Sequence, residues 1–304
     1  MSISVLGIFV ADLVFFGKKI PVEGETILGS NFVIGPGGKG SNQAVAAAKA
    51  GVKTYFISKI GNDQFGQMAT KIYDEAKVDY SNVIISKEYS TGAAAIMVNE
   101  QSGANAINVF TGAADAITNN DIDKAEDSIK NSKIFLTQLE VPKETVLYSI
   151  KKAKELGVQT ILNPAPAAEI DKSIFPFIDY FTPNETEASF YVNHPVVTHT
   201  DASKAAVTLL EMGIKNVIIT LGEKGAFFAN SNETFSSPIA NLSNRVVDTT
   251  GAGDAFNAGL AAALTENQSI RDAIAFASAT AGLSTTKIGT ANSMPIREEI
   301  DKIL

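Results

Sequence analysis

Short apolar runs alternate with helical periodicity along most of the chain. The runs predict buried strands at 5–9, 55–60, 134–136, 160–162, 178–181 and 217–220. Between and after them, apolar residues recur every three or four positions, which predicts helices at 68–76, 145–156, 202–212 and 270–283. Buried strands that alternate with amphipathic helices are typical of a parallel sheet covered on both faces. The pattern therefore predicts an α/β fold. Two antiparallel strands are predicted late in the chain, at 226–228 and 233–235.

Two segments interrupt this rhythm. Residues 11–35 mix aromatic and β-branched residues with glycine and proline, which indicates short strands and turns. Residues 91–112 contain two alternating runs, 91–99 and 106–110, joined by a polar turn, which indicates a hairpin. We expect the two segments to form one small sheet that acts as a lid, since ligands bind at the carboxyl ends of parallel strands. No repeat or linker divides the chain, so one domain spanning 1–304 is predicted.

The composition argues against several classes of function. The chain has 25 basic and 33 acidic residues and a net charge of −8, without a basic stripe, which argues against a nucleic acid partner. It contains no cysteine, which excludes disulfides, thiol catalysis and cysteine-bound metals. Its two histidines, His194 and His199, lie in a polar segment and are interpreted as solvated, so a Ser-His-Asp triad is not expected. No run is long enough to span a membrane and no signal peptide is evident, so we expect a soluble, cytoplasmic protein.

The stretch Asp248–Leu260 carries the strongest signal for chemistry. Gly251 and Gly253 stand at the start of an alanine-rich helix, where free backbone N–H groups and the helix dipole bind anions. Asp254 lies at the same helix start, and a carboxylate beside an anion site is suited to deprotonate a group that receives the anion. The pattern indicates phosphoryl transfer to a hydroxyl group, with Asp254 as the base. The simpler alternative is a glycine turn with an aspartate N-cap.

The glycine-rich loop Gly35–Gly40 is comparable to two known nucleotide-binding motifs. Its glycine spacing matches the dinucleotide fingerprint, and Asp63 follows some twenty residues later. An NAD-linked oxidoreductase that uses this loop is therefore the alternative from another class. Against it, the loop does not follow the first buried strand, and Lys39 lies inside it. A Walker-type phosphate loop is excluded, because glycine rather than serine or threonine follows Lys39.

Polar residues follow several predicted strands. Thr182–Glu187 comes after the strand at 178–181. One interpretation is a capping box from Thr182 to Glu185 that opens a helix. The other is a site for phosphates and hydrated Mg²⁺ at Asn184 and Glu187. The turn Thr220–Gly225 is suited to enclose a nucleotide, although alone it is only a β-turn. Glu140, just past the strand at 134–136, is either solvated or an acceptor for a hydroxyl group.

Three of these motifs resemble those of one enzyme family. Gly-Gly-Lys-Gly-Ser-Asn-Gln-Ala-Val-Ala at 37–46 and Asp-Thr-Thr-Gly-Ala-Gly-Asp-Ala-Phe at 248–256 resemble the two signatures of the ribokinase-like (PfkB) carbohydrate kinases, and Asn184-x-x-Glu187 resembles the third. Their order and spacing match over essentially the whole chain. The resemblance implies a three-layer α/β/α fold with a mostly parallel sheet and a β-sheet lid. It also implies ATP- and Mg²⁺-dependent transfer to the 5-hydroxyl of a pentose, activation by K⁺, and a homodimer joined through the lid.

The resemblance also implies roles for individual residues. Asp254 is the base, and the anion hole is formed by the amides of Gly251, Ala252 and Gly253. The sugar is held by Asp12, Gly38, Lys39, Gly40, Asn42, Glu140 and Asp254. ATP lies against Asn184, Thr220, Gly222, Gly225, Gly253 and Ser278, with Glu187 reaching Mg²⁺ through water. The positions that match the K⁺ site are Asp248, Thr250, Ser284, Lys287, Gly289 and Ser293.

One position departs from the family pattern. The family's ribose kinases usually have Asn-x-Asp after the first strand, whereas this chain has Val10-Ala11-Asp12. A sugar hydroxyl facing Val10 would lack a hydrogen-bond partner, so 2-deoxyribose is an alternative to D-ribose. Fructose, a nucleoside and a sugar phosphate also stay open as acceptors, as does a nonenzymatic sugar-binding protein, although a retained base at Asp254 argues against the last.

Overall fold

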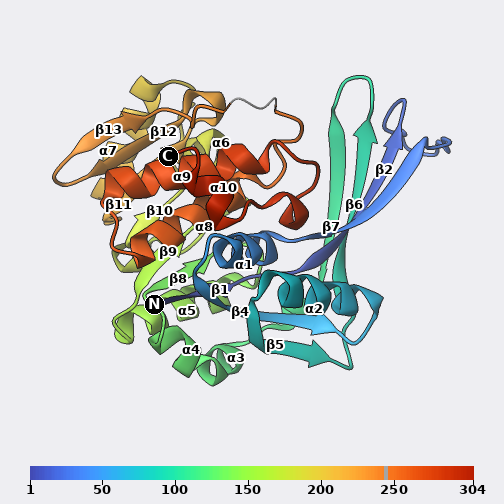
Figure 1. Ribbon diagram of the computed structural model, residues 1–304, viewed down its shortest axis with the longest axis horizontal. Helices are drawn as coiled ribbons and strands as arrows, with labels where there is room; N and C mark the ends of the chain where they lie inside the picture. Colours follow the sequence, from blue (N-terminus) through green and yellow to red (C-terminus); the bar gives the residue numbers. More distant parts are fainter. Residues whose placement is uncertain (243–245) are drawn as a thin grey trace.

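A computed structural model describes residues 1–242 and 246–304, and it places a nine-stranded sheet between two layers of helices (Figure 1). In spatial order the strands are β13 (Thr234–Ser237), β12 (Ala226–Asn230), β11 (Asn216–Thr220), β10 (Tyr180–Phe181), β9 (Gln159–Leu162), β8 (Ile134–Thr137), β1 (Ser2–Leu6), β4 (Lys53–Gly61) and β5 (Asp79–Ser86). The strands from β11 to β5 pair in parallel, and β12 and β13 are antiparallel. The predicted α/β/α class with a mostly parallel sheet is confirmed.

Each face of the large sheet is covered by helices from different parts of the chain. One core contains α1 (Lys39–Lys49), α2 (Gln64–Ala76), α8 (Ala252–Thr265), α9 (Ile270–Ser284) and α10 (Arg297–Asp301). The other contains α3 (Asn119–Lys124), α4 (Glu126–Lys130), α5 (Lys143–Glu155), α6 (Glu185–Val192) and α7 (His199–Glu211). Strand side chains alternate between the cores: Ile134 and Leu136 enter the first, and Phe135 enters the second. Within the described ranges, no helix combines the length and apolar character needed to cross a membrane.

Several elements differ from the sequence expectation, three of them in the first 90 residues. The first strand ends at Leu6 rather than at Phe9, because the next segment bonds to α1 instead, with the Ser41 N–H donating to the Ile8 carbonyl (3.1 Å). Helix α1 already begins at Lys39, inside the predicted glycine loop. The edge strand β5 was not predicted, because it opens with the polar run from Asp79 and has only β4 as a neighbour.

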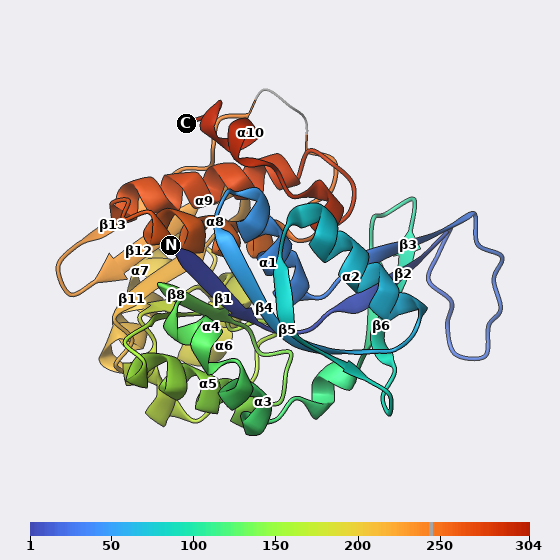
Figure 2. The same ribbon diagram turned by 60° about the horizontal axis from the view of Figure 1, so that its bottom comes forward.

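A second, smaller sheet projects from the α/β body (Figures 1 and 2). Its strand order is β3 (Asn31–Gly37), β2 (Val10–Gly17), β6 (Thr91–Asn99) and β7 (Asn105–Gly112). The two segments singled out in the sequence, 11–35 and 91–112, thus supply its strands, and β6 and β7 form the predicted hairpin. Because the parallel pairing of β2 with β6 joins the two segments, they form one continuous sheet.

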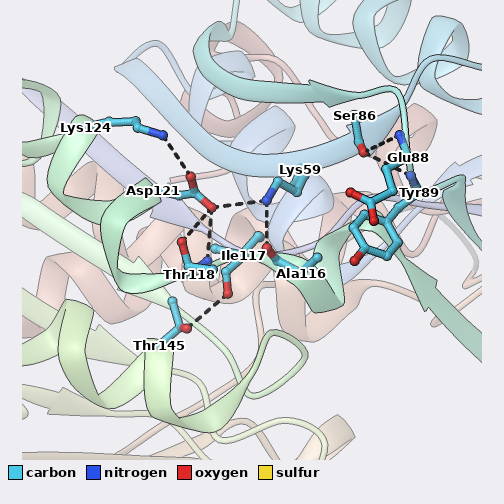
Figure 3. Close-up of polar contacts among 10 residues, drawn as sticks. All are labelled: Lys59, Ser86, Glu88, Tyr89, Ala116, Ile117, Thr118, Asp121, Lys124 and Thr145. Atoms are coloured by element: carbon cyan, nitrogen blue, oxygen red, sulfur yellow. Dashed lines mark hydrogen bonds and ion pairs between the residues drawn. The ribbon is translucent and has the colours of Figure 1, made fainter.

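The hairpin is fixed to the body at both of its ends. At one end, Asp63 caps α2 and also accepts hydrogen bonds from the N–H (2.7 Å) and hydroxyl (2.7 Å) of Thr91. At the other end, the Lys59 ammonium donates to the Ala116 carbonyl (2.7 Å) and to Asp121 (3.2 Å), as Figure 3 shows. These contacts attach both ends of the hairpin to the α/β body, and the part of the hairpin distant from them projects away from it.

Lys59 is expected to contribute much more stability than Lys124, although both pair with the same carboxylate, Asp121. The Lys59 side chain is 15% exposed and that of Lys124 is 64% exposed. Lys59→Met removes a largely buried ammonium that donates to the Ala116 carbonyl and to the buried Asp121 carboxylate, so the free energy of unfolding should fall by about 1–3 kcal/mol. Lys124→Met removes only a solvated ion pair and should cost less than about 0.5 kcal/mol. Urea denaturation of both variants measures the difference; equal losses would contradict this ranking.

Candidate active site

A cavity of about 170 Å³ lies where the carboxyl ends of β9, β10 and β11 approach the starts of α1, α6 and α8. Predicted site residues that line it are Lys39, Asn184, Glu187, Thr220, Gly251, Gly253 and Asp254. The other lining residues are Asn163, Ala165, Thr182 and Asn257, which sequence reasoning did not assign to the site. Open α/β sheets bind their ligands at this edge. The cavity therefore lies where a ligand site is expected, and residues predicted for the site line it.

The glycine loop turns the end of β3 into the start of α1. Gly38 has φ 88°, and a Cβ there would lie 2.5 Å from the Ile8 carbonyl oxygen, so only glycine fits. The turn aims the Lys39 N–H at Glu140 Oε2 (2.9 Å). Gly35 and Gly37 belong to β3 in the small sheet and not to a turn after a central strand. The dinucleotide interpretation of this loop is therefore wrong, and Asp63 serves instead as the cap of α2.

Asp254 is buried at the start of α8, where the residue is 6% exposed. The helix starts after Gly251, whose φ of 80° is a left-handed conformation that favours glycine. Asn42 Nδ2 donates to Asp254 Oδ2 (2.9 Å), and Gln43 Nε2 donates to Oδ1 (3.0 Å). The two motifs recognised in the sequence therefore meet directly, through one carboxylate.

Backbone donors surround the same helix start. The predicted anion hole consists of the amides of Gly251, Ala252 and Gly253, but the Ala252 N–H donates to the Thr249 carbonyl (3.2 Å) and so closes the turn. Within the described residues, the N–H groups of Gly253 and Asp254 have no acceptor in the chain, as expected for the first turn of a helix. A Cβ at Gly253 would meet no atom within 4 Å, so the space beside these donors is open. The helix start can therefore receive an anion.

The charges of Asp254 and Lys39 shift each other's pKa in this site. Burial raises the pKa of the Asp254 carboxyl, and the Lys39 ammonium and the two amide donors oppose that rise. Asp254 in turn raises the pKa of Lys39, against the effect of burial. Lys39 is therefore a cation, and Asp254 is a stronger base than a solvated aspartate.

Three further carboxyl groups lie close enough to respond to these charges. Burial raises the pKa of Glu140 to about 7 against the effect of Lys39, and Asp254 and Asp12 add to the rise. Burial, then Asp254, raises the pKa of Asp12 to about 6. Burial also raises the pKa of Glu187. Crowded carboxylates attract cations and hydroxyl donors, so the site is suited to a polyol and a hydrated metal ion.

The segment after β10 forms a capping box, but not the one expected. Asn184, and not Thr182, caps α6: its Oδ1 accepts from the Glu187 N–H (2.8 Å), and its own N–H donates to Glu187 Oε2 (2.9 Å). The predicted box from Thr182 to Glu185 is wrong because the helix begins two residues later. Both functional candidates, Asn184 and Glu187, line the cavity.

The remaining nucleotide candidates lie in two places. Thr220 ends β11 and lines the cavity, and the turn that follows contains Gly222 (φ 54°) and Gly225 (φ 87°). Ser278 lies half-buried on α9, outside the residues that line the cavity. Their contact with a nucleotide stays a prediction.

The candidates for the cation site lie in two loops that are tied together. The Asp248 carboxylate accepts hydrogen bonds from the N–H groups of Thr250 (2.9 Å) and Gly289 (3.0 Å). The Lys287 N–H lies 3.5 Å from the Ser284 carbonyl, and its ammonium pairs with Glu299. Ser293 is buried, and its hydroxyl donates to the Thr290 carbonyl (2.7 Å). A Cβ at Gly251 would contact Thr290, so these loops support the helix start that carries Asp254.

Val10 and Asp12 project from the same face of the small sheet, because side chains alternate along β2. Their ladder neighbours on β3 and β6 are all glycine or alanine. Burial and the nearby charge of Asp254 both raise the pKa of Asp12, so Asp12 lies within electrostatic range of the base. Val10 is 4% exposed and packs against the backbone at Gly92. Val10 is therefore a buried apolar side chain on the same side of the small sheet as Asp12, and it belongs to the core cluster that also contains Ile8 and Ala94.

Comparisons with known proteins agree with this geometry. Residues 1–297 match the pfkB family of carbohydrate kinases. The chain is 38% identical to the ribokinase of Haemophilus influenzae over 298 residues, covering 98% of this chain and 96% of that protein. It is 36% identical to the deoxyribokinase of Salmonella typhi over 305 residues, covering 100% and 99%. The structure of Arabidopsis thaliana ribokinase complexed with ribose and ATP has a TM-score of 0.93 and 32% identity, covering 99% of this chain and 98% of that one.

The chain therefore belongs to the pfkB family of carbohydrate kinases. It is a sugar kinase that transfers a phosphoryl group to an alcohol, and the oxidoreductase alternative is set aside.

Proposed function

We propose that this protein transfers the γ-phosphoryl group of ATP to the 5-hydroxyl of D-ribose. The observation that carries the proposal is the buried Asp254 carboxylate, held by two amides beside the free N–H groups of Gly253 and Asp254. The names of the relatives support the substrates, since the Arabidopsis structure is described as a ribokinase with ribose and ATP.

The chemistry follows from this arrangement. As the sugar oxygen bonds to the γ-phosphorus, its proton passes to the Asp254 carboxylate, and the bond to the oxygen bridging the β- and γ-phosphorus breaks to release ADP. The negative charge that develops on the phosphoryl oxygens lies near the α8 start and the Lys39 ammonium. Asp12, Asn42 and Glu140 hold the other sugar hydroxyls, together with the backbone of Gly38 and Gly40.

The residues present fit Mg²⁺ bound through water. Glu187 has both carboxylate oxygens engaged by Asn184 and lines the cavity, so it is positioned to accept from metal-bound water. Among the residues the structure describes, no cluster of three or more acidic or histidine side chains forms a direct metal site. Mg²⁺ would neutralise phosphate charge, held by ATP oxygens and water rather than by a protein cage.

K⁺ is proposed to bind between the loops around Asp248 and Ser284–Ser293, which the Asp248 carboxylate joins by accepting from the N–H groups of Thr250 and Gly289. It would brace the Gly251 turn, and its removal should loosen the donors at the helix start. We expect kcat to fall at least about tenfold when KCl is replaced by tetramethylammonium chloride at equal ionic strength. Steady-state ADP release in the two salts measures the effect, and equal rates would rule out the cation requirement.

The small sheet is proposed to be the lid and to pair with that of a second subunit. Large apolar side chains on its strands are more than a third exposed: Phe15, Phe32, Val33, Ile34, Met97, Ile107, Val109 and Phe110. The strand register puts five of them on one face, Phe15, Phe32, Ile34, Met97 and Phe110, and the other three on the face that carries Asp12. Exposed apolar side chains gathered on one face of a sheet are typical of a protein interface. Sedimentation equilibrium distinguishes the expected dimer from a monomer.

A second candidate substrate is 2-deoxyribose. It is favoured by one observation: Val10, beside Asp12, offers no hydrogen bond to a hydroxyl group at that position. The chain also covers nearly the full length of a deoxyribokinase, to which it is 36% identical.

The test of function is ADP release with ATP, Mg²⁺ and K⁺ for ribose, 2-deoxyribose, fructose, adenosine and fructose 6-phosphate. The highest kcat/KM is expected for ribose. Preference for 2-deoxyribose would select the second candidate. Turnover on fructose, adenosine or the sugar phosphate alone, or on none of the five, would overturn the pentose assignment.

A further inference from the structure

Gln43 occupies the centre of a buried amide cluster behind Asp254. Its Nε2 donates to Asp254 Oδ1 (3.0 Å) and to Asn163 Oδ1 (3.2 Å), and its Oε1 accepts from Gln138 Nε2 (2.5 Å). Gln43 and Gln138 are fully or almost fully buried. Gln138 directly follows β8 and Asn163 directly follows β9, so the central sheet fixes both neighbours.

One backbone carbonyl sets the orientation of the amides in this cluster. Asn163 Nδ2 donates to the Thr182 carbonyl (3.2 Å), which can only accept. Asn163 therefore presents its oxygen to Gln43, and Gln43 must present its NH₂ group to Asn163 and Asp254 together. A flipped Gln43 would place its carbonyl oxygen against two other oxygens. The amide donor to the base is thus fixed by the fold.

We propose that Gln43 is a positioning residue for phosphoryl transfer, which fixes the rotation of the Asp254 carboxylate and keeps it able to accept a proton. The inference rests on the base role proposed for Asp254. Asn42 holds Oδ2 and Gln43 holds Oδ1, so the carboxylate is clamped at both oxygens. Without the Gln43 clamp the carboxylate can rotate away from the approaching hydroxyl group, and misplacement of a reacting group by even 1 Å costs about 10²-fold in rate.

Removal of the clamp also has a defined effect on protonation. Charged groups face Asp254 from the surrounding elements: Asp12 from β2, Lys39 from α1, Glu140 after β8 and Glu187 from α6. These groups are present in the wild type and in a Gln43 variant alike. A donated hydrogen bond favours the ionised carboxylate, so its loss raises the pKa of Asp254. Activity that needs ionised Asp254 is then lost at a higher pH.

The test compares Gln43→Met with the wild type. Methionine keeps the length of the side chain and removes the donor. We expect kcat to fall about 10- to 100-fold, KM for sugar and ATP to stay within about threefold, and the acid limb of the kcat–pH profile to move up by about one pH unit. Gln43→Glu, which has the same shape and places a second carboxyl against Asp254, should move the limb further.

Gln138→Met is the matched control, because it removes a neighbour of Gln43 but leaves the donor to Asp254 in place. Its acid limb should stay within about 0.3 pH unit of the wild type. If Gln43→Met lowers kcat without moving the acid limb, or raises KM alone, Gln43 supports only the packing and the inference fails.

A second readout does not depend on turnover. Carbon-13 NMR of aspartate-labelled protein follows the Asp254 carboxyl, identified by its absence in Asp254→Asn. The titration should move to higher pH in Gln43→Met and stay in place in Gln138→Met. An unmoved titration overturns the inference even if the enzyme is active. If the wild type phosphorylates no sugar, the proposed function fails, and the NMR comparison still decides whether Gln43 controls the state of Asp254.

Discussion

Asp254→Asn is expected to lower kcat by about 10²–10⁴-fold, because an amide cannot accept the proton of the sugar hydroxyl. The KM for ATP should stay unchanged or fall, since the substitution removes a negative charge from a cavity proposed to hold phosphates. Steady-state ADP release over a range of both substrates separates the two constants. The size of the loss shows how much of the rate depends on proton transfer rather than on positioning and charge stabilisation.

Asp272→Asn provides a matched control for this substitution. Asp254 and Asp272 both occupy the third position of a helix, in α8 and α9 respectively, but Asp272 is exposed and bonds to the cap Ser269. Its replacement should leave kcat within about twofold. Unchanged turnover in Asp254→Asn, with the fold verified by circular dichroism, would remove Asp254 from the base role.

Local patterns were sufficient to predict most of the central layer. The strand β8 was visible as a short apolar run, because Ile134 and Leu136 enter one core and Phe135 enters the other, so both of its faces are buried. The glycines at 38 and 251 were recognisable because left-handed turns and close approaches exclude other residues. The start of α6 was misplaced because Thr-Pro-Asn-Glu-Thr-Glu contains two capping boxes, and local rules do not choose between Thr182 and Asn184.

The amide cluster behind the base was not predictable in the same way. Gln43 bonds to residues 95, 120 and 211 positions away in the sequence. These contacts exist only because the parallel sheet brings the ends of β8 and β9 next to the starts of α1 and α8. Buried amides carry no periodic signal, and Gln43 stood out only as part of a motif whose other members had clearer roles. The sequence therefore pointed to the reacting groups better than to the side chains that hold them.

Val10→Asn is expected to raise the ratio of kcat/KM for ribose to that for 2-deoxyribose by about 10- to 100-fold. Val10 lies on the same side of β2 as Asp12, and its ladder neighbours Gly37 and Gly92 carry no side chain. An asparagine there gives the 2-hydroxyl a partner and leaves a buried amide unpaired when that hydroxyl is absent. The direction of the change does not depend on which sugar the wild type prefers.

Val10→Ala separates this effect from a change in packing, because it alters the volume without adding a hydrogen-bonding group. It should change kcat/KM for both sugars by a similar factor. Each ratio is measured on one preparation, so any loss of stability from burying an amide cancels. A ratio that stays within threefold in Val10→Asn would show that Val10 does not face the sugar, and selectivity would then rest on Asp12, Asn42 and Glu140. A shift of the expected size would make this strand position the determinant that separates ribose from 2-deoxyribose on an otherwise shared site.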